Sequence, residues 1–203
     1  MKQVLTEEQR DGLIEIINIG VGRAAGYMNE MIASNVELSV PEVKLLSSDE
    51  VGANSPIEEV EEISCVYLGF SGQLVGRGGF ALTSADSIKL AAALTHEAPS
   101  SPELLACLTE TLSETGNILI NGVLASISDI LKLRAEFTVP GFVRGKAEDV
   151  MKVFNVSDND VIIFIRARFS ISDYDISGNI LLIFQVESFD ALVSGINQLY
   201  LEG

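Results

Sequence analysis

The feature that most constrains this chain is a polar pattern that occurs twice, 99 residues apart. In its first copy, Asp11, Glu15 and Asn18 stand at spacing i, i+4, i+7, and Pro41 follows after 22 intervening residues. The second copy has the same spacing and the same interval before its proline: Glu110, Glu114, Asn117 and Pro140. Three polar positions and a proline that match at one offset indicate an internal duplication.

The predicted elements repeat at about the same distance. Periodic apolar residues predict long helices over 6–33 and 103–131, and shorter helices over 84–96 and 188–200 close the two halves. Alternating and β-branched runs predict three strands in each half: 35–46, 63–70 and 73–83, then 132–143, 161–171 and 177–186. Each half therefore has the order helix, three strands, helix.

Local signals place several boundaries. Thr6 and Gln9 form a capping box at the start of the first long helix. Ser84 is the predicted N-cap of the first short helix. Two charged segments, 47–62 and 144–159, are predicted as loops.

Pro41 and Pro140 interrupt the first strand of each half, which predicts a sheet edge or a bulge because proline cannot donate to a ladder. Each half, approximately 1–100 and 101–203, has too few strands to cover its own apolar faces. We therefore expect an α+β fold in which both repeats form one pseudo-two-fold domain over 1–203. Its single antiparallel sheet would carry the long helices.

The repeated polar residues share one stripe of each long helix. Spacing of 0, 4 and 7 places them within an arc of about 60°. The next position on the stripe is Gly22 in the first helix and Asn121 in the second. The opposite side is apolar: Leu13, Ile16, Ile17 and Ala24, then Leu112, Leu119, Ile120 and Val123. Each helix is thus expected to bury one side and to present two carboxylates and an amide on the other.

A polar stripe on an amphipathic helix is ordinarily only a solvated face. A solvated face usually mixes lysine with glutamate at i, i+4 spacing, whereas these stripes hold no lysine or arginine. Asparagine is a poor residue for a helix interior, yet it occurs at the same stripe position in both copies. Together with the duplication, this composition favours a functional surface.

The chain carries 29 acidic and 13 basic residues, a formal net charge of −16. Nucleic acids and anionic membranes attract clustered lysine and arginine, so the charge argues against both as partners. It permits a basic protein partner, although acidity alone also serves solubility. The start lacks the apolar run of a signal peptide, and no apolar stretch reaches the ~20 residues of a membrane span, so we expect a cytoplasmic protein.

Few residues are suited to bind a metal. His96 is the one histidine, and Cys65 and Cys107 lie far apart in apolar surroundings, where we expect free buried thiols. We therefore expect neither a metal nor a cofactor bound by this chain. The glycine-rich segment 72–79 lacks the Gly-Lys-Ser/Thr ending of a nucleotide loop, and a hairpin turn explains it better.

The motif Asp-x3-Glu-x2-Asn, followed by 22 residues and proline, resembles the signature of the CheC/CheX/FliY phosphatases of bacterial and archaeal chemotaxis. Residues 18–25, NIGVGRAA, are similar to the NIGxGxAA run of the CheC type. Both halves match, so the resemblance covers essentially the whole chain. Two positions depart from the family: Glu110, where Asp or Ser is usual, and Arg23, where Asn is frequent.

The resemblance implies a phosphatase that hydrolyses the aspartyl phosphate of a CheY-like receiver domain. Asn18 and Asn117 would orient the attacking water, since an amide both accepts and donates hydrogen bonds. Glu15 and Glu114 would anchor a lysine of the partner, because the phosphate repels a carboxylate. The remaining stripe residues would be accessory positions for partner binding, and the two prolines structural: Asp11, Gly22, Glu110 and Asn121, then Pro41 and Pro140.

The same resemblance implies a metal ion on the partner and two alternative functions for this chain. The Mg²⁺ that such receivers hold beside the phosphate would come with the partner. A non-catalytic adaptor that binds a CheD-like receptor deamidase remains open, as does a component of the flagellar switch similar to the middle domain of FliM. The two intact Glu-Asn pairs favour the enzyme over a scaffold, since a scaffold needs neither pair.

Overall fold

The computed structural model describes residues 5–32, 35–47, 50, 62–171 and 174–202. Its helices are α1 (Glu7–Ile32), α3 (Ser84–Thr95), α4 (Pro102–Leu131), α5 (Ala147–Phe154) and α6 (Val186–Glu202). Its strands are β1 (Val36–Leu46), β2 (Ile63–Gly72), β3 (Gly76–Thr83), β4 (Ala135–Phe137), β5 (Gly141–Gly145), β6 (Val161–Ile171) and β7 (Tyr174–Phe184).

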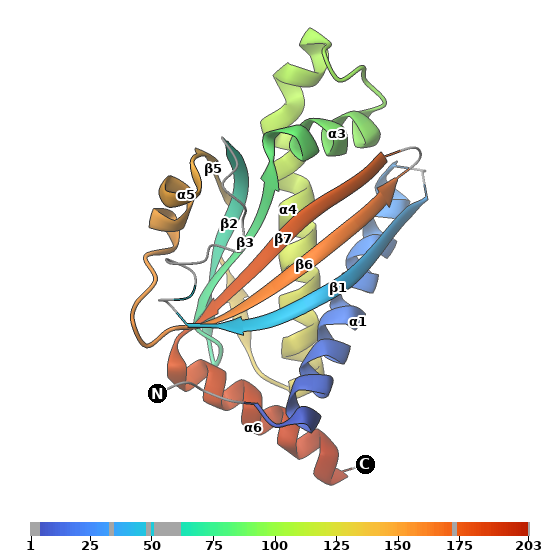
Figure 1. The fold of residues 1–203 in the computed structure, drawn as a ribbon. Coiled ribbons are helices and arrows are strands. Elements are labelled where there is room, and N and C mark those ends of the chain that lie inside the picture. The colour runs from blue at the N-terminus through green and yellow to red at the C-terminus, as the bar shows by residue number, and fades with distance from the viewer. Residues whose placement is uncertain (1–4, 33–34, 48–49, 51–61, 172–173, 203) are drawn as a thin grey trace.

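The strands form one seven-stranded sheet whose pairs are all antiparallel (Figure 1). The order is β1-β6-β7-β3-β2-β4, and β5 also pairs with β2. The expected α+β fold with a single antiparallel sheet is confirmed. In the proposed correspondence, β6 and β7 match β2 and β3, and β4 together with β5 matches β1. Exchanging the two halves then gives the same strand order, read from the opposite edge of the sheet. This arrangement supports our proposal that the domain consists of two repeats.

Both prolines lie where an outer strand gains one residue relative to its neighbour. In β1, Ser39 pairs with Arg168 and Glu42 with Arg166, so Pro41 lies in a bulge of an edge strand. Pro140 lies between β4 and β5, which both pair with β2 and likewise enclose one extra residue. The prediction of an edge or a bulge is confirmed for both prolines, because neither bulge needs the missing N–H.

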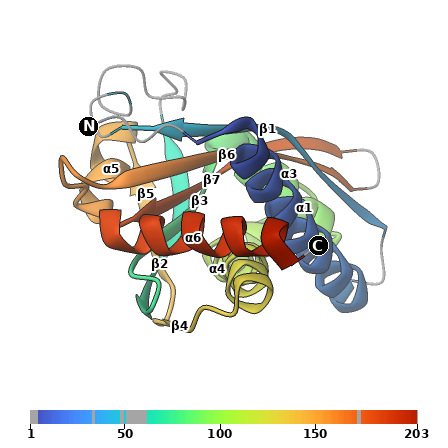
Figure 2. The same cartoon turned by 90° about the horizontal axis from the view of Figure 1, so that it is seen from below.

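The long helices α1 and α4 run antiparallel to each other and cover one face of the sheet (Figure 1). They contact each other so closely that a Cβ added at Gly20 would lie 2.6 Å from the Cα of Val123. Helix α6 lies across their ends (Figure 2), where the Gln9 side chain donates to Asn197 Oδ1 at 2.9 Å. The apolar sides predicted for both long helices are buried in this layer.

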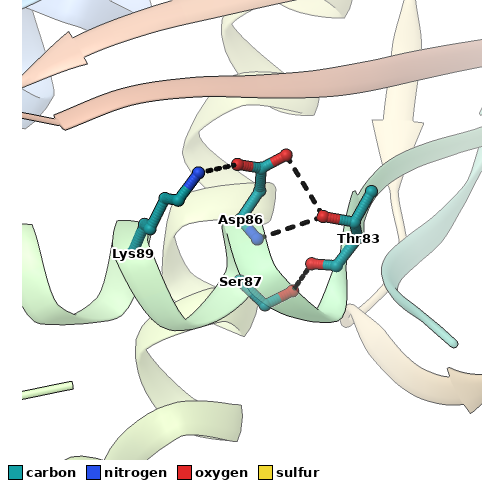
Figure 3. Close-up of polar contacts among 4 residues, drawn as sticks. All are labelled: Thr83, Asp86, Ser87 and Lys89. Carbon is teal, nitrogen blue, oxygen red and sulfur yellow. Dashed lines mark hydrogen bonds and ion pairs between the residues drawn. The ribbon is translucent and has the colours of Figure 1, made fainter.

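The two predicted N-caps have different outcomes. The capping box of α1 is confirmed: the Thr6 amide donates to Gln9 Oε1 at 2.9 Å, and the Gln9 amide to Thr6 Oγ1 at 3.2 Å. The cap of α3 is Thr83, whose hydroxyl accepts from the Asp86 amide at 3.1 Å (Figure 3). The prediction of Ser84 was wrong by one residue, because the last strand residue already has the extended backbone that a cap requires.

The prediction of a loop over 144–159 was wrong, because this segment contains α5. Val150 and Phe154, spaced i, i+4, are fully buried on the sheet face opposite α1 and α4. Although five of the eight residues of α5 are apolar, two helical turns are too short a pattern to distinguish from a loop when charged residues surround them. Most of the other predicted loop, 47–62, lies outside the described residues.

Candidate functional site

The first stripe lies on the outer side of α1. Asp11, Glu15 and Asn18 are all exposed; of the isoleucines next to Glu15 and Asn18, Ile16 and Ile17 are buried, Ile14 is half-buried, and Ile19 is itself exposed. A shallow hollow of about 540 Å³ lies over this stripe, lined by the same three residues together with Ile14 and Ile19. A carboxylate and an amide therefore face an open, partly apolar depression that another molecule can enter.

The end of this stripe has no side chain. Gly22 is exposed, and a Cβ added there would meet nothing within 4 Å. No hydrogen bond joins the side chain of Asn18 to another of the described residues, so the packing of this chain does not restrain its amide. The sequence predicted Gly22 as an accessory position, and the structure places it next to Asn18 on the open side of the helix.

The second stripe, on α4, is less open. Glu110 and Glu114 are exposed, whereas Asn117 and Asn121 are half-buried. The Asn121 amide Nδ2 donates to Asn117 Oδ1 at 2.8 Å. The sequence placed both asparagines on one stripe but did not reveal this bond, although their i, i+4 spacing is a signal for it.

The two stripes are separate surfaces, because α1 and α4 meet along a different side of each helix. Glycines make that contact: Gly20 O lies 3.0 Å from a Cβ built at Gly122. Arg23, one of the two positions that depart from the pattern of the resembling family, reaches across to Asp129 of α4 with Nη1 3.1 Å from Oδ2. The structure thus holds two Glu-Asn pairs on one closely packed helix pair, and sequence reasoning missed the ion pair that links the helices.

Other chemical groups are few in the part of the chain that the structure describes. No cluster of three or more histidine, cysteine, aspartate or glutamate side chains suited to a metal ion occurs among these residues. None of the described helices combines the length and the apolar character that a membrane crossing requires. Both cysteines are free thiols, but only Cys65 is fully buried as expected, while Cys107 is half-buried. Burial raises the pKa of the Cys65 thiol to about 12.

Known proteins resemble this chain in sequence and in fold. No family model matches it. In sequence it is similar to the CheY-P phosphatase CheC of Bacillus subtilis, with 27% identity over 172 residues that make up 78% of this chain and 79% of that protein. In fold it is similar to FliY of Thermotoga maritima, with a TM-score of 0.73 and 15% identity across 97% of this chain and 99% of that chain.

Two further structures share the fold. One is the CheX-CheY-BeF3-Mg complex from Borrelia burgdorferi, with a TM-score of 0.53 and 19% identity across 84% of this chain and 97% of the matched chain. The other is the middle domain of FliM from H. pylori, with a TM-score of 0.62 and 14% identity across 94% of this chain and 99% of that chain.

These similarities show that the chain has the fold of the CheC/CheX/FliY proteins, and the expected resemblance to this group is confirmed. Within this class, its sequence is similar to CheC along most of both chains.

Proposed function

We propose that this protein is a phosphatase that hydrolyses the aspartyl phosphate of a CheY-like receiver domain in chemotaxis. The similarity to CheC, a CheY-P phosphatase, and the fold shared with a CheX-CheY complex support this role. The observation that carries the proposal is the accessibility of both Glu-Asn pairs. Glu15 and Asn18 are exposed, as is Glu114, and Asn117 is half-buried on the same helix face as Glu114. A partner can therefore dock on either stripe.

The asparagines would position the attacking water. Phosphoryl transfer has a loose transition state, so placing a water in line with the phosphorus matters more than a strong base. The amide of Asn18 or Asn117 accepts a hydrogen bond from this water and donates another toward the phosphoryl oxygens. A hundredfold acceleration corresponds to about 2.7 kcal/mol, which one oriented water is able to supply.

The glutamates would hold the partner. Glu15 and Glu114 lie one turn before the asparagines, and a carboxylate repels a phosphoryl group but attracts a lysine. We propose that each pairs with a lysine beside the partner's phosphorylated aspartate, which keeps the asparagine in register with the phosphorus. Asp11 and Glu110, one turn earlier, extend the acidic surface. The Mg²⁺ belongs to the receiver, and no step assigned here to this chain uses a metal.

The test measures phosphate release from a phosphorylated CheY-type receiver domain. Asn18→Ala combined with Asn117→Ala should reduce the rate to that of the receiver alone, with an unchanged circular-dichroism spectrum. Asn159→Ala is the control, because Asn159 is also an exposed asparagine but lies in a turn, on neither stripe. Full activity in the double variant would refute the assignment of the asparagines.

The glutamates make a separate kinetic prediction. Glu15→Gln combined with Glu114→Gln should raise KM more than it lowers kcat, because the charge that attracts the partner's lysine is lost while both water-orienting amides remain. An unchanged KM would contradict the docking role.

A non-catalytic role is the second candidate, because the FliM middle domain has the same fold and occurs in a FliG-FliM complex. In this alternative the chain would bind a switch component or a CheD-like deamidase, and the Glu-Asn pairs would serve only as a binding surface. Phosphate release separates the two: an adaptor binds the receiver or the deamidase without accelerating dephosphorylation. A pull-down with a CheD homologue tests the deamidase directly.

A further inference from the structure

The two stripes differ at one position next to the asparagine. Asn121 of α4 donates from Nδ2 to Asn117 Oδ1 at 2.8 Å. The matching position of α1 is Gly22, which offers no side chain and is surrounded by open space. The Asn117 side chain is therefore restrained by a neighbour on its own helix, whereas the Asn18 side chain makes no hydrogen bond with any of the described residues.

Asn121 holds this geometry at the expense of its own hydrogen bonding. Its Oδ1 is shielded from solvent and has no hydrogen-bond partner among the described residues. A buried amide oxygen without a partner destabilises a protein, and alanine is also the better helix former. Fold stability alone therefore does not account for an asparagine here, and the one side-chain hydrogen bond that Asn121 makes among the described residues goes to Asn117.

We propose that Asn121 is a positioning residue that orients the amide of Asn117 for hydrolysis, and that it makes the second site faster than the first. The inference rests on the proposed phosphatase function. A carbonyl oxygen has two lone pairs, so Asn117 Oδ1 accepts from Asn121 and still has a lone pair for the attacking water. The amide plane is set before the partner docks, and its N–H groups stay free to donate.

The expected advantage follows from side-chain entropy. Asn18 has to lose its rotamer freedom when the receiver docks, whereas Asn117 has lost most of it already. We expect about a fivefold difference in kcat, which is ~1 kcal/mol at 1.36 kcal/mol per tenfold. KM should change little, because Glu114 and Glu15 make the contact with the partner at both sites.

The experiment isolates each site in the full chain and measures phosphate release from a phosphorylated CheY-type receiver. In an Asn18→Ala background, Asn121→Ala should lower kcat about fivefold without raising KM, and its urea midpoint should be equal or higher. An unchanged kcat overturns the inference. So does a kcat loss that comes with an equal loss of stability, because a merely structural role predicts that result.

The reverse exchange tests the same inference without removing a native contact. In an Asn117→Ala background, Gly22→Asn places a donor at i, i+4 from Asn18 and should raise the kcat of the first site about fivefold. Gly26→Asn is the matched control, because it makes the same exchange at an exposed, open position of the same helix but lies two turns from Asn18, and it should leave kcat unchanged. Equal rates for the Gly22→Asn and Gly26→Asn variants overturn the inference.

Failure of this inference can be told apart from failure of the proposed function. If Asn18→Ala with Asn117→Ala abolishes the acceleration of dephosphorylation while Asn121→Ala has no effect, the phosphatase assignment is retained and the positioning role of Asn121 is refuted. If the double variant keeps full activity, the phosphatase assignment itself falls.

Discussion

The contact between α1 and α4 makes a sharp prediction about Gly20. A Cβ added at Gly20 would lie 2.6 Å from the Cα of Val123 and 2.9 Å from Gly122 O, both backbone atoms that cannot rotate away. Ordinary van der Waals contact begins at 3.4 Å, so the helices would have to separate by about 0.8 Å. Gly20→Ala should therefore disturb the layer that supports both stripes.

The size of the effect follows from two opposing terms. Alanine in place of glycine favours the helix by about 1 kcal/mol. Overpacking against a rigid backbone destabilises by about 3 kcal/mol, the upper end of the usual range, because backbone rather than a flexible side chain must move. We expect Gly20→Ala to lower the free energy of unfolding by about 2 kcal/mol.

Gly26 provides the matched control on the same helix. It is exposed, and a Cβ added there would meet nothing within 4 Å, so Gly26→Ala should raise the free energy of unfolding by about 1 kcal/mol. Urea unfolding followed by circular dichroism measures both values. At about 2–4 °C per kcal/mol, Tm should fall by ~4–8 °C for Gly20→Ala and rise by ~2–4 °C for Gly26→Ala. Equal stability of the two variants would refute the close helix contact.

Two further predictions concern the cap of α3 and the buried thiol. Thr83→Ala should lower the free energy of unfolding, measured in urea, by about 1 kcal/mol, because Thr83 caps the helix. Ser84→Ala should lower it by less, and a larger loss for Ser84→Ala would contradict this assignment of the cap. Burial raises the pKa of Cys65 from 9.0 to about 12. The folded state therefore keeps the thiol protonated at a pH where the unfolded chain ionises it. The stability that comes from this difference is complete below pH 9 and is lost as the pH rises toward 12, by about 1.4 kcal/mol per pH unit. Cys65→Ala should flatten that part of the stability–pH curve, and an equally steep curve would contradict the burial of the thiol.

Most helices and strands of the fold were predictable because their signals are local. The capping box at Thr6 and Gln9, the apolar sides of α1 and α4, and the polar stripes all depend on residues within one or two turns of each other. The two prolines predicted an edge or a bulge for the same reason, since a missing N–H acts at one position of a ladder.

The predictions that were wrong concern segments whose structure depends on contacts with distant parts of the chain. Helix α5 forms because Val150 and Phe154 find a buried surface on the far face of the sheet, which eight charged and apolar residues cannot reveal by themselves. The cap of α3 moved to Thr83 because strand β3, paired with β2 and β7, extends up to that residue.

The sequence by itself determined that two helices each carry an acid and an amide on one narrow stripe, because helical periodicity is set by the backbone. Only the tertiary structure decided how accessible each stripe is: Asn18 is exposed, whereas Asn117 and Asn121 are half-buried. The reason is that exposure depends on how α1 and α4 pack on the sheet and on each other. No spacing along the chain records that packing.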